Sequence, residues 1–565
     1  MKRLILVTTS VLLLCGPAVQ GQQKAYPHRW FYRSTNLQVG KNADETIRLA
    51  ETAAKHGLNG MVLADWKHNR LGDVPREYFA NVARVRAACK RLGIDVIPTL
   101  FPIGYSSGIL LHDPNLAEGL PVTSAPFVVE GGVARLAGDG TSLPNGDFEQ
   151  LPARAGKPFP GVRWMDAPGV SAVADRQVVK LGRTSLRMGD FRKGRPDHGN
   201  CRVVWNVKLT PHRCYRIGGW VKTDRVSPVR SVRIQVLAPR GVGQSGHHSL
   251  GHEDPPVKAT GDWKRFDILF NSLDHSEANV YVGIWGGRAG RIWWDGLVLE
   301  ECGIVNALRR EGTPLTVTSA DGASVYEEGK DFEAIPGPKN GSYRWHAPLP
   351  IRLTRTSRIK EGQKLAVSWY HPAKIHWGQV ACCMSAPKVY RILDDQCRRV
   401  VKLFEHPNWL FMSHDEIRTA GTDLACTKRK MTCGEILADN VRKCTAICRR
   451  HNPTGRICVW SDMLDPTHNA KDHYYLCGST FAGSWKGLDK DVVIVNWFGR
   501  PGSLEHFQKL GHKQIAAAYY DQDLDQVRGW LKKLKPIDGT IGIMYTTWQH
   551  KYADLAAFGD LVSGK

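Results

Sequence analysis

Residues 60–101 read GMVLADWKHNRLGDVPREYFANVARVRAACKRLGIDVIPTLF. The run 60–65 predicts a short buried strand, 75–92 has the apolar spacing of an amphipathic helix, and 95–101 predicts a second strand. Two apolar strands joined by such a helix pair in parallel, with helices covering both faces of the sheet. This stretch therefore predicts an α/β fold built on a parallel sheet.

The same alternation of strand and helix extends in both directions along the chain. A strand at 30–34 and a helix at 44–56 come before this stretch, and the pattern returns after residue 384. The later segments that predict strands are 409–414, 456–460, 492–497, 514–520 and 542–548. Three strands before the gap and five after it make eight, which predicts a (β/α)8 TIM barrel interrupted after strand 3.

The segment between the two halves has a different character. From about residue 141 to residue 302 the chain is rich in Val, Ile, Trp and turn residues, which predicts an all-β domain. It opens with Asn145-Gly146-Asp147-Phe148-Glu149 and closes with the run RIWWDGLVLE at 291–300. These two ends resemble those of the galactose-binding-like jelly roll of carbohydrate-binding modules, and the resemblance implies that fold. Sugar binding by this domain and a spacer role are both open.

Residues 303–371 are also β-rich and are interpreted as a small β subdomain of the insertion. The alternative is that they supply a ninth barrel strand, which would weaken the barrel hypothesis. The predicted division of the chain is 1–21 signal peptide, 22–124 first part of the TIM barrel, 125–302 jelly-roll domain, 303–371 small β subdomain and 372–565 second part of the barrel.

The N-terminus predicts export. Met1-Lys2-Arg3 precedes an apolar run at 4–14 and the small-residue exit Val19-Gln20-Gly21, as in a secretory signal peptide. The run is too short to span a bilayer comfortably, so we expect no membrane insertion. The predicted location is secreted or periplasmic. Lipoprotein anchoring at Cys15 is the alternative, and the bulky Leu14 before it argues against lipidation.

Composition and charge narrow the class of partner. A chain of 565 residues needs two or three domains, and 42% hydrophobic residues are too many for a disordered protein. The formal charge of +23 favours acidic partners, and for an exported protein we expect a sulfated or uronate-bearing polysaccharide or oligosaccharide. The alternative is that Lys and Arg only solvate the surface. No nucleic-acid motif occurs, so we expect no nucleic acid as partner.

Thirteen cysteines follow Cys15, an odd number that, in an exported protein, predicts loop-bracing disulfides and at least one free thiol. A zinc site is less favoured because no C-x-x-C pair occurs, so the sequence predicts no metal and no cofactor. One exception is open: Asp147, Glu149 and Asp295 are candidates for a structural calcium ion in the jelly roll. The sequence does not specify an oligomeric state.

In a barrel of this kind, function lies at the carboxyl ends of the strands. Carboxylates and aromatic residues gather at those predicted ends, as in a sugar-binding site. The candidates are Asp415 and Glu416 as catalytic residues, and Arg33, Asp65, His414, Trp460, Asp462, Trp497, Tyr520, Asp521 and Trp548 as substrate-binding residues.

The pair Asp415-Glu416 after strand four is the most informative of these. Cleavage of a glycosidic bond needs a proton donor for the leaving oxygen and a group that stabilises the positive centre. Two adjacent carboxyl groups supply both, because the charge of one raises the pKa of the other. The alternative is a solvated surface pair or a helix cap.

The Asp-Glu pair at this strand end resembles that of glycoside hydrolase family 20, the β-N-acetylhexosaminidases. The resemblance implies that Glu416 is the general acid and that Asp415 orients the substrate's own N-acetyl group, which attacks the anomeric carbon. Arg33, Asp65, Trp460, Trp497, Tyr520 and Trp548 fall in places comparable to family positions. This chain departs from the pattern at Ser413-His414, where the family has a glycine-rich stretch.

The preferred hypothesis is therefore an exported glycoside hydrolase. Two alternatives use the same barrel. One is a retaining glycosidase with Glu416 as acid/base and Asp521 as nucleophile, which needs carboxyl groups about 5–5.5 Å apart. The other is a non-catalytic polysaccharide-binding protein on a decayed glycosidase barrel.

Overall fold

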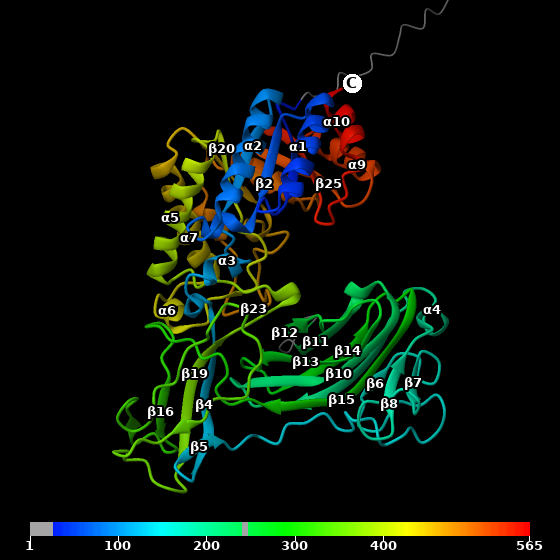
Figure 1. Ribbon diagram of the computed structural model, residues 1–565, viewed down its shortest axis with the longest axis vertical. Coiled ribbons are helices and arrows are strands. Elements are labelled where there is room, and N and C mark those ends of the chain that lie inside the picture. The colour runs from blue at the N-terminus through cyan, green and yellow to red at the C-terminus, as the bar shows by residue number, and fades with distance from the viewer. Residues whose placement is uncertain (1–25, 240–246, 565) are drawn as a thin grey trace, which may run out of the picture.

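The computed structural model describes residues 26–239 and 247–564, so the predicted signal peptide and Cys15 lie outside the described residues. Eight parallel strands form a closed barrel, which confirms the predicted barrel core (Figure 1). In order around the barrel they are β1 (His28–Ser34), β2 (Gly60–Ala64), β3 (Asp95–Leu100), β20 (Trp409–Met412), β22 (Arg456–Trp460), β24 (Val493–Asn496), β25 (Gln514–Tyr520) and β26 (Thr540–Thr546).

Amphipathic helices cover the outside of the barrel and bury its outward-facing side chains. They are α1 (Gly40–Lys55), α2 (Arg76–Leu92), α5 (Pro387–Leu403), α7 (Cys433–His451), α8 (Ser503–Lys509), α9 (Leu524–Leu534) and α10 (Leu555–Ser563). The caps agree with helix physics: Thr432 and Glu435 form a capping box at the start of α7, and Gly93 ends α2 in the left-handed conformation. Within the described residues, no helix has the length and apolar character needed to cross a membrane.

The interior of the barrel is filled by side chains from alternate strand positions. Trp30 of β1 and Trp409 of β20 meet edge to face with ring centroids 4.9 Å apart, and both are buried. Gly60 of β2 lies against the Trp30 ring, where a side chain would collide. Tyr32 and Trp460 lie further along their strands, toward the carboxyl end.

β4 to β19, which separate β3 from β20 in the chain, belong to three other sheets. Two five-stranded sheets pack face to face around a shared apolar core and form a β-sandwich. One sheet contains β13 (Gly261–Asn271), β10 (Cys214–Ser227), β15 (Ala289–Glu301), β8 (Ser185–Met188) and β7 (Ala172–Asp175). The other contains β12 (His247–Glu253), β11 (Val232–Pro239), β14 (Glu277–Ile284), β9 (Cys201–Lys208) and β6 (Trp164–Met165). The short helix α4 (Phe191–Gly194) lies between β8 and β9 in the chain.

The third sheet joins the two ends of this long segment. It contains β17 (Val325–Tyr326), β16 (Thr316–Ser319), β19 (Lys364–Pro372), β4 (Gly119–Glu130), β5 (Val133–Leu136) and β18 (Ile351–Arg352). β4 and β19 pair antiparallel from Gly119 opposite Pro372 to Lys364 opposite Val128. The predicted boundary between residues 124 and 125 therefore falls inside β4. Local sequence patterns do not reveal pairing between segments so far apart, so the predicted division splits β4 between the barrel and the jelly roll and assigns β5 to the jelly roll.

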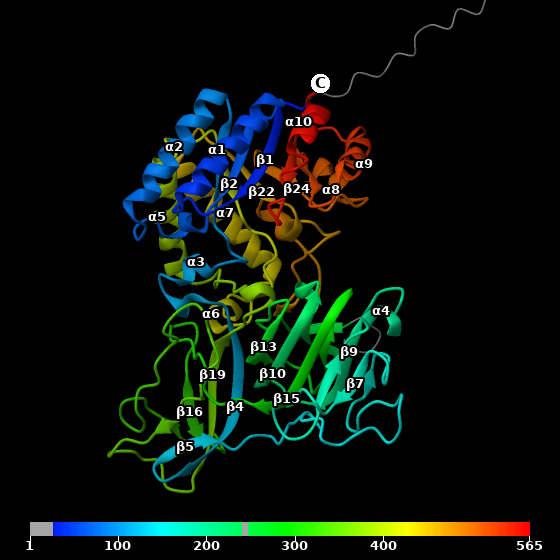
Figure 2. The same ribbon diagram turned by 45° about the vertical axis from the view of Figure 1, so that its right-hand side comes forward.

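The sandwich and the six-stranded sheet both lie at one end of the barrel, near α3 (Ser107–Leu110) and α6 (Leu424–Thr427) (Figures 1 and 2). This is the carboxyl end of the strands, because the chain enters β4 shortly after β3 ends. The two β domains therefore stand beside the end of the barrel where function is expected.

The predicted disulfides are absent. All thirteen cysteines of the described segments are free thiols, and all except Cys477 are buried. Buried cysteine packs as a small apolar residue, which accounts for its frequency here without any bridge.

The calcium candidates have other partners. The Asp295 carboxylate accepts hydrogen bonds from the backbone N–H groups of Lys180 and Leu181, at 2.7 and 3.0 Å. Glu149 likewise accepts from the backbone N–H groups of Arg183 and Thr184. These carboxylates therefore fix the turn before β8.

Replacing Gly60 with Ala tests the barrel packing. An added Cβ would lie 2.3 Å from Cδ1 of Trp30, so we expect Gly60→Ala to lower the free energy of unfolding by about 1–3 kcal/mol. Gly40→Ala, at the start of α1 with no atom within 4 Å of the added Cβ, is the matched control and should be neutral or slightly stabilising. Urea unfolding measures both, and an unchanged Gly60→Ala midpoint would contradict the packing argument.

Candidate active site

The segment that follows β20 brings Asp415 and Glu416 to the mouth of the barrel. Glu416 has a φ of +49°, in the left-handed region that a non-glycine residue seldom occupies. The loop after β3 packs directly on this turn: a Cβ on Gly104 would lie 2.2 Å from the carbonyl oxygen of Asp415. Backbone strain of this kind persists where surrounding contacts impose it, and it is concentrated at functional sites.

Four neighbours hold Glu416. Its Oε1 lies 2.7 Å from Nη2 of Arg418, and the hydroxyl of Tyr105 donates to its Oε2. Its backbone N–H donates to Oδ2 of Asp462 at 2.9 Å, and its carbonyl oxygen accepts from Nε2 of Gln379 at 2.6 Å. Both the backbone and the side chain of Glu416 are therefore fixed before any substrate arrives.

Asp415 and Asp462 form a group of carboxyl groups with Glu416. Burial, followed by the charges of Asp462 and Glu416, raises the pKa of Asp415 well above its ordinary value of 3.8. Burial also raises the pKa of Asp462 to about 6, although Asp462 accepts hydrogen bonds from Asn469 at 2.9 Å and from Trp497 Nε1 at 3.3 Å. The protonated form of Asp415 is therefore favoured beside the ion pair of Glu416 and Arg418.

Aromatic rings surround these carboxyl groups. The rings of Tyr32, Trp460 and Trp548 contact one another, with centroids 4.9 Å apart for Tyr32 and Trp548, 6.0 Å for Tyr32 and Trp460, and 6.1 Å for Trp460 and Trp548. Tyr520 stacks on Trp497 at 5.6 Å with 9° between the ring planes, and it meets Trp548 at 6.3 Å. Trp548 is 39% exposed, so one ring of this wall is open to solvent. Flat apolar faces beside carboxyl groups match the faces and hydroxyl edges of a sugar ring.

The structure therefore brings together seven of the predicted residues. They are Asp415, Glu416, Trp460, Asp462, Trp497, Tyr520 and Trp548.

Arg33 and Asp65 lie outside this group. Arg33 points from β1 toward α1, where it pairs with Glu45 at 2.8 Å and donates to Thr46 Oγ1 at 3.1 Å. Asp65 caps the 3-10 helix η1 (Trp66–Arg70) and accepts from the backbone N–H of Leu37 at 2.8 Å. Both are buried polar groups that join a barrel strand to the segment covering it.

His414 and Asp521 are also occupied elsewhere. His414 is buried against α7, its Nε2 lies 3.0 Å from Oδ1 of Asn440, and burial lowers its pKa to about 4. The carboxylate of Asp521 accepts from the hydroxyl of Thr547 and, at 2.8 Å, from the backbone N–H of Trp548. Asp521 therefore fixes the loop after β26 and has little capacity left to attack a substrate.

Sequence reasoning missed Tyr32, Tyr105, Gln379 and Arg418. The inward direction of Tyr32 could have been predicted from the sequence, because Tyr32 shares with Trp30 the strand face that points into the barrel. Arg418 is two residues beyond Glu416, in a loop where no periodicity predicts its direction. Tyr105 and Gln379 lie on opposite sides of the long insertion, so only the folded chain brings them together at Glu416.

The sandwich contacts the support of this site. Gln379 follows the 3-10 helix η4 (His376–Gly378), whose His376 stacks on His252 of β12 with ring centroids 4.4 Å apart. The side-chain oxygen of Gln379 accepts from Arg418. A continuous set of contacts therefore links the sandwich to the carboxylate of Glu416.

A scan against protein-family models finds no match, and a search of curated proteins finds none either. Solved structures include a chitobiase of Flavobacterium johnsoniae, with a TM-score of 0.36 and 8% identity over 95% of this chain and 48% of the chitobiase chain. A rhamnosidase of Novosphingobium sp. has a TM-score of 0.31 and 10% identity over 96% of this chain and 60% of its own. A family 16 carbohydrate-binding module covers 23% of this chain and 86% of its own, with 13% identity and a TM-score of 0.18. Each TM-score is below 0.5, so these likenesses assign no function to this chain.

Asp415→Asn tests the electrostatics of this group. Because the folded-state pKa of Asp415 is raised, its contribution to stability is present below the unfolded pKa near 3.8 and is lost as the pH rises toward the folded value. We therefore expect Asp415→Asn to be more stable than the wild type at pH 7–8, by about 1 kcal/mol, and the difference to shrink toward pH 4. Calorimetric melting across this pH range measures it.

Asp525→Asn is the control for the substitution itself, because the Asp525 carboxylate is 85% exposed. A stability difference for Asp415→Asn that grows toward low pH would contradict the raised pKa.

Proposed function

We propose that the chain is an exported glycoside hydrolase whose active site is the mouth of the barrel. The observation that carries the proposal is the contact of Asp415, Glu416 and Asp462 within a wall of aromatic rings. Such a site offers a proton, a negative charge and apolar ring faces together, as glycosidic cleavage requires. Export is supported by the N-terminal sequence alone.

The contacts support a division of roles that differs from the sequence hypothesis. Burial and the charges of Asp462 and Glu416 favour the protonated form of Asp415, so we assign it as the donor to the leaving oxygen. Glu416 is paired with Arg418 and accepts from Tyr105, so it acts as the negative charge that faces the positive centre. The opposite assignment, with Glu416 as the acid, would require Glu416 to gain a proton while it remains beside a guanidinium group.

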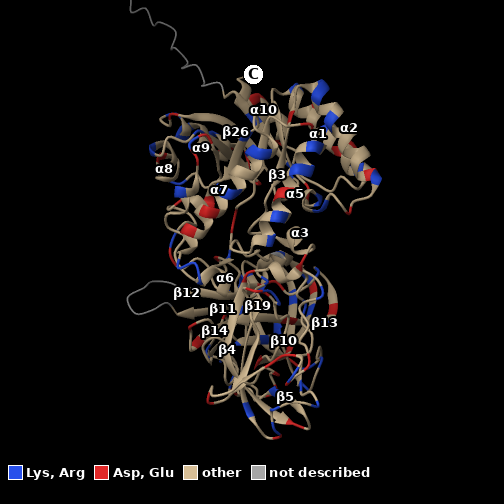
Figure 3. Cartoon of the chain, turned by 90° about the vertical axis from the view of Figure 1, so that its left-hand side faces the viewer, with Lys and Arg blue, Asp and Glu red and all other residues tan. Residues whose placement is uncertain are grey.

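The substrate class follows from composition and the site together. The net charge of +23 supports a glycan that carries acidic or sulfate groups. In Figure 3 the basic residues are spread over the barrel helices and the β domains among acidic ones, which supports a diffuse attraction rather than one basic track. The sandwich, beside the mouth of the barrel, is proposed to hold the same polysaccharide near the site.

Leaving-group dependence tests the division of roles. We expect the wild type to hydrolyse aryl β-N-acetylglucosaminide or galactosaminide, and both Asp415→Asn and Glu416→Gln to lose several hundred-fold or more in kcat/KM on a poor leaving group. A dinitrophenyl glycoside needs no proton donor, so Asp415→Asn should recover most of its activity on it while Glu416→Gln should not. Recovery by Glu416→Gln alone would reverse the assignment.

Asp521→Asn separates this proposal from the retaining mechanism that uses Asp521. Because Asp521 holds a loop through backbone hydrogen bonds, we expect a loss of less than tenfold in kcat and a lower melting temperature. A complete loss of activity in a folded variant, with recovery by added azide, would identify Asp521 as the nucleophile instead.

A non-catalytic polysaccharide-binding protein is the second candidate, favoured by one observation: the carboxylate of Glu416 is already engaged by Arg418 and Tyr105. This candidate predicts glycan binding that Glu416→Gln leaves unchanged, and no cleavage of any aryl glycoside or glycan.

Trp548→Ala tests the aromatic wall under the proposed function. Loss of the exposed ring should raise KM about tenfold, equivalent to about 1.4 kcal/mol, with a smaller change in kcat. Phe79→Ala is the matched control, since Phe79 is an aromatic residue that is 38% exposed on α2, on the outside of the barrel. Equal effects of the two substitutions on KM would argue against a substrate platform at Trp548.

A further inference from the structure

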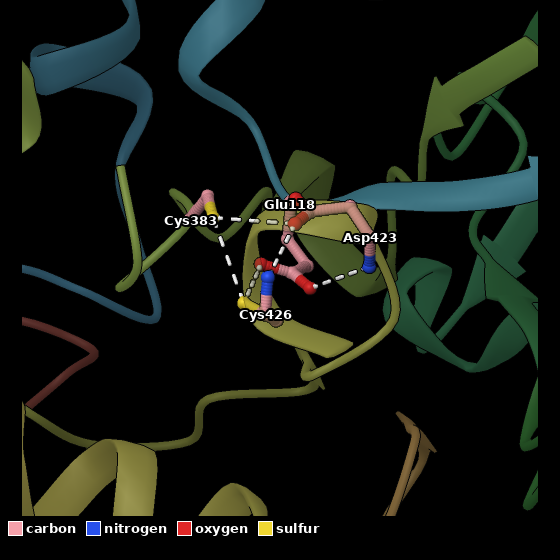
Figure 4. A group of neighbouring side chains, drawn as sticks. All are labelled: Glu118, Cys383, Asp423 and Cys426. Carbon is pink, nitrogen blue, oxygen red and sulfur yellow. Dashed lines mark hydrogen bonds between the residues drawn. The ribbon is translucent and has the colours of Figure 1, made fainter. Parts of the chain in front are cut away.

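A second group of chemically reactive side chains lies outside the active site. It consists of Glu118, Cys383, Asp423 and Cys426, all buried, and one ligand atom from each lies within 4.8 Å of the others (Figure 4). Glu118 immediately precedes β4, Cys383 precedes α5, and Asp423 and Cys426 belong to the start of α6. Three segments that are distant in the chain therefore aim their side chains at one point.

The atoms of this group are already in contact. The two sulfur atoms are 3.6 Å apart, Sγ of Cys426 lies 3.4 Å from Oε2 of Glu118, and Sγ of Cys383 lies 3.6 Å from Oδ1 of Asp423. Because all four ligand atoms lie within 4.8 Å of one another, a single ion at their centre could reach all of them after small side-chain rotations.

The charges in the group are unbalanced. Two carboxylates are buried here, and the cation that faces them is the guanidinium of Arg310, which donates to Asp423 and to the carbonyl oxygens of Asn115 and Ala117. Glu118 is held by the backbone N–H groups of Thr422 and Asp423, at 2.7 and 3.2 Å. One guanidinium thus faces two buried carboxyl groups, and burial of like charges is costly, so a divalent cation would stabilise this arrangement.

We propose that Glu118, Cys383, Asp423 and Cys426 form a structural zinc site. Two thiolates and two carboxylates suit a four-coordinate zinc ion, whereas calcium and magnesium need more oxygen ligands. Binding of one Zn²⁺ deprotonates both thiols and releases two protons to solvent, and no oxidation occurs. Four protein ligands leave no open position, so the site is structural rather than catalytic.

The position of the site gives it a role. The segment leading into β4 carries Glu118, and the segment returning from β19 toward α5 carries Cys383. The ion would join these two connecting segments to the loop after β20, which also carries Glu416. It would therefore hold the β domains to the barrel, and this role is independent of the proposed hydrolase activity.

Sequence spacing could not indicate this site. Glu118 and Cys426 are 308 residues apart, and Cys383 and Cys426 are separated by 43. No short motif joins them, so the absence of a C-x-x-C pair has no bearing on the proposed site.

Metal content of the full chain tests the proposal. After purification in zinc-containing buffer without chelators, we expect about one zinc per chain by mass spectrometry of the elements, falling below about a tenth in the Cys383→Ser/Cys426→Ser double variant. Cys382→Ser is the matched control and should keep the metal, because Cys382 is a neighbouring buried cysteine that is not one of the four. Retention of zinc by the double variant, or no zinc in the wild type, would overturn the proposal.

A second measurement does not depend on folding of the variants. Reduced wild-type chain, unfolded and refolded with one equivalent of Zn²⁺, should melt several degrees higher than chain refolded with chelator, and Co²⁺ in place of Zn²⁺ should give a thiolate-to-cobalt absorption band. Equal melting temperatures with no such band would overturn the proposal. A disulfide between Cys383 and Cys426 in peptide mass analysis of chain prepared without reductant would also overturn it.

Discussion

Side chains on a β-strand alternate between two faces, and in a closed barrel only one of those faces reaches the interior and the mouth. This constraint decides the composition of the site. On β1 it directs Tyr32 inward and Arg33 toward α1, and after β20 it directs His414 outward against α7. A shift of one residue in any of these strands would exchange a buried structural group for a substrate-facing one.

The barrel itself could be predicted because its signals are local. Each strand is a short apolar run, each helix has its own periodicity, and every predicted strand has a counterpart in the closed barrel. Membership of the site was harder to predict, since a residue such as Asp65 at a strand end can turn either way. Tyr105 and Arg418 lie in loops, where only the folded backbone determines direction. The pairing of β4 with β19 could not be predicted either, because it joins segments that are distant in the sequence.

That pairing explains how a large insertion coexists with a regular barrel. Because the outgoing strand β4 and the returning strand β19 bond to each other, the ends of the insertion are held side by side. The barrel therefore closes between β3 and β20 as if a short loop joined them. The same geometry places Gln379, on the returning segment, within reach of both Glu416 and Arg418. The segment that returns from β19 to the barrel therefore helps to hold the residues of the candidate active site in place.

Three neighbouring carboxyl groups, with the guanidinium of Arg418 beside Glu416, do not favour stability, because burial and like charge both oppose ionisation. The fold nevertheless holds them there through the backbone N–H of Glu416, the Asn469 amide and the indole of Trp497. These donors act on Asp462 and leave Asp415 with the highest cost of ionisation. This distribution of donors favours the protonated form of Asp415 beside the ion pair of Glu416 and Arg418, which is the arrangement that the proposed acid-assisted cleavage uses.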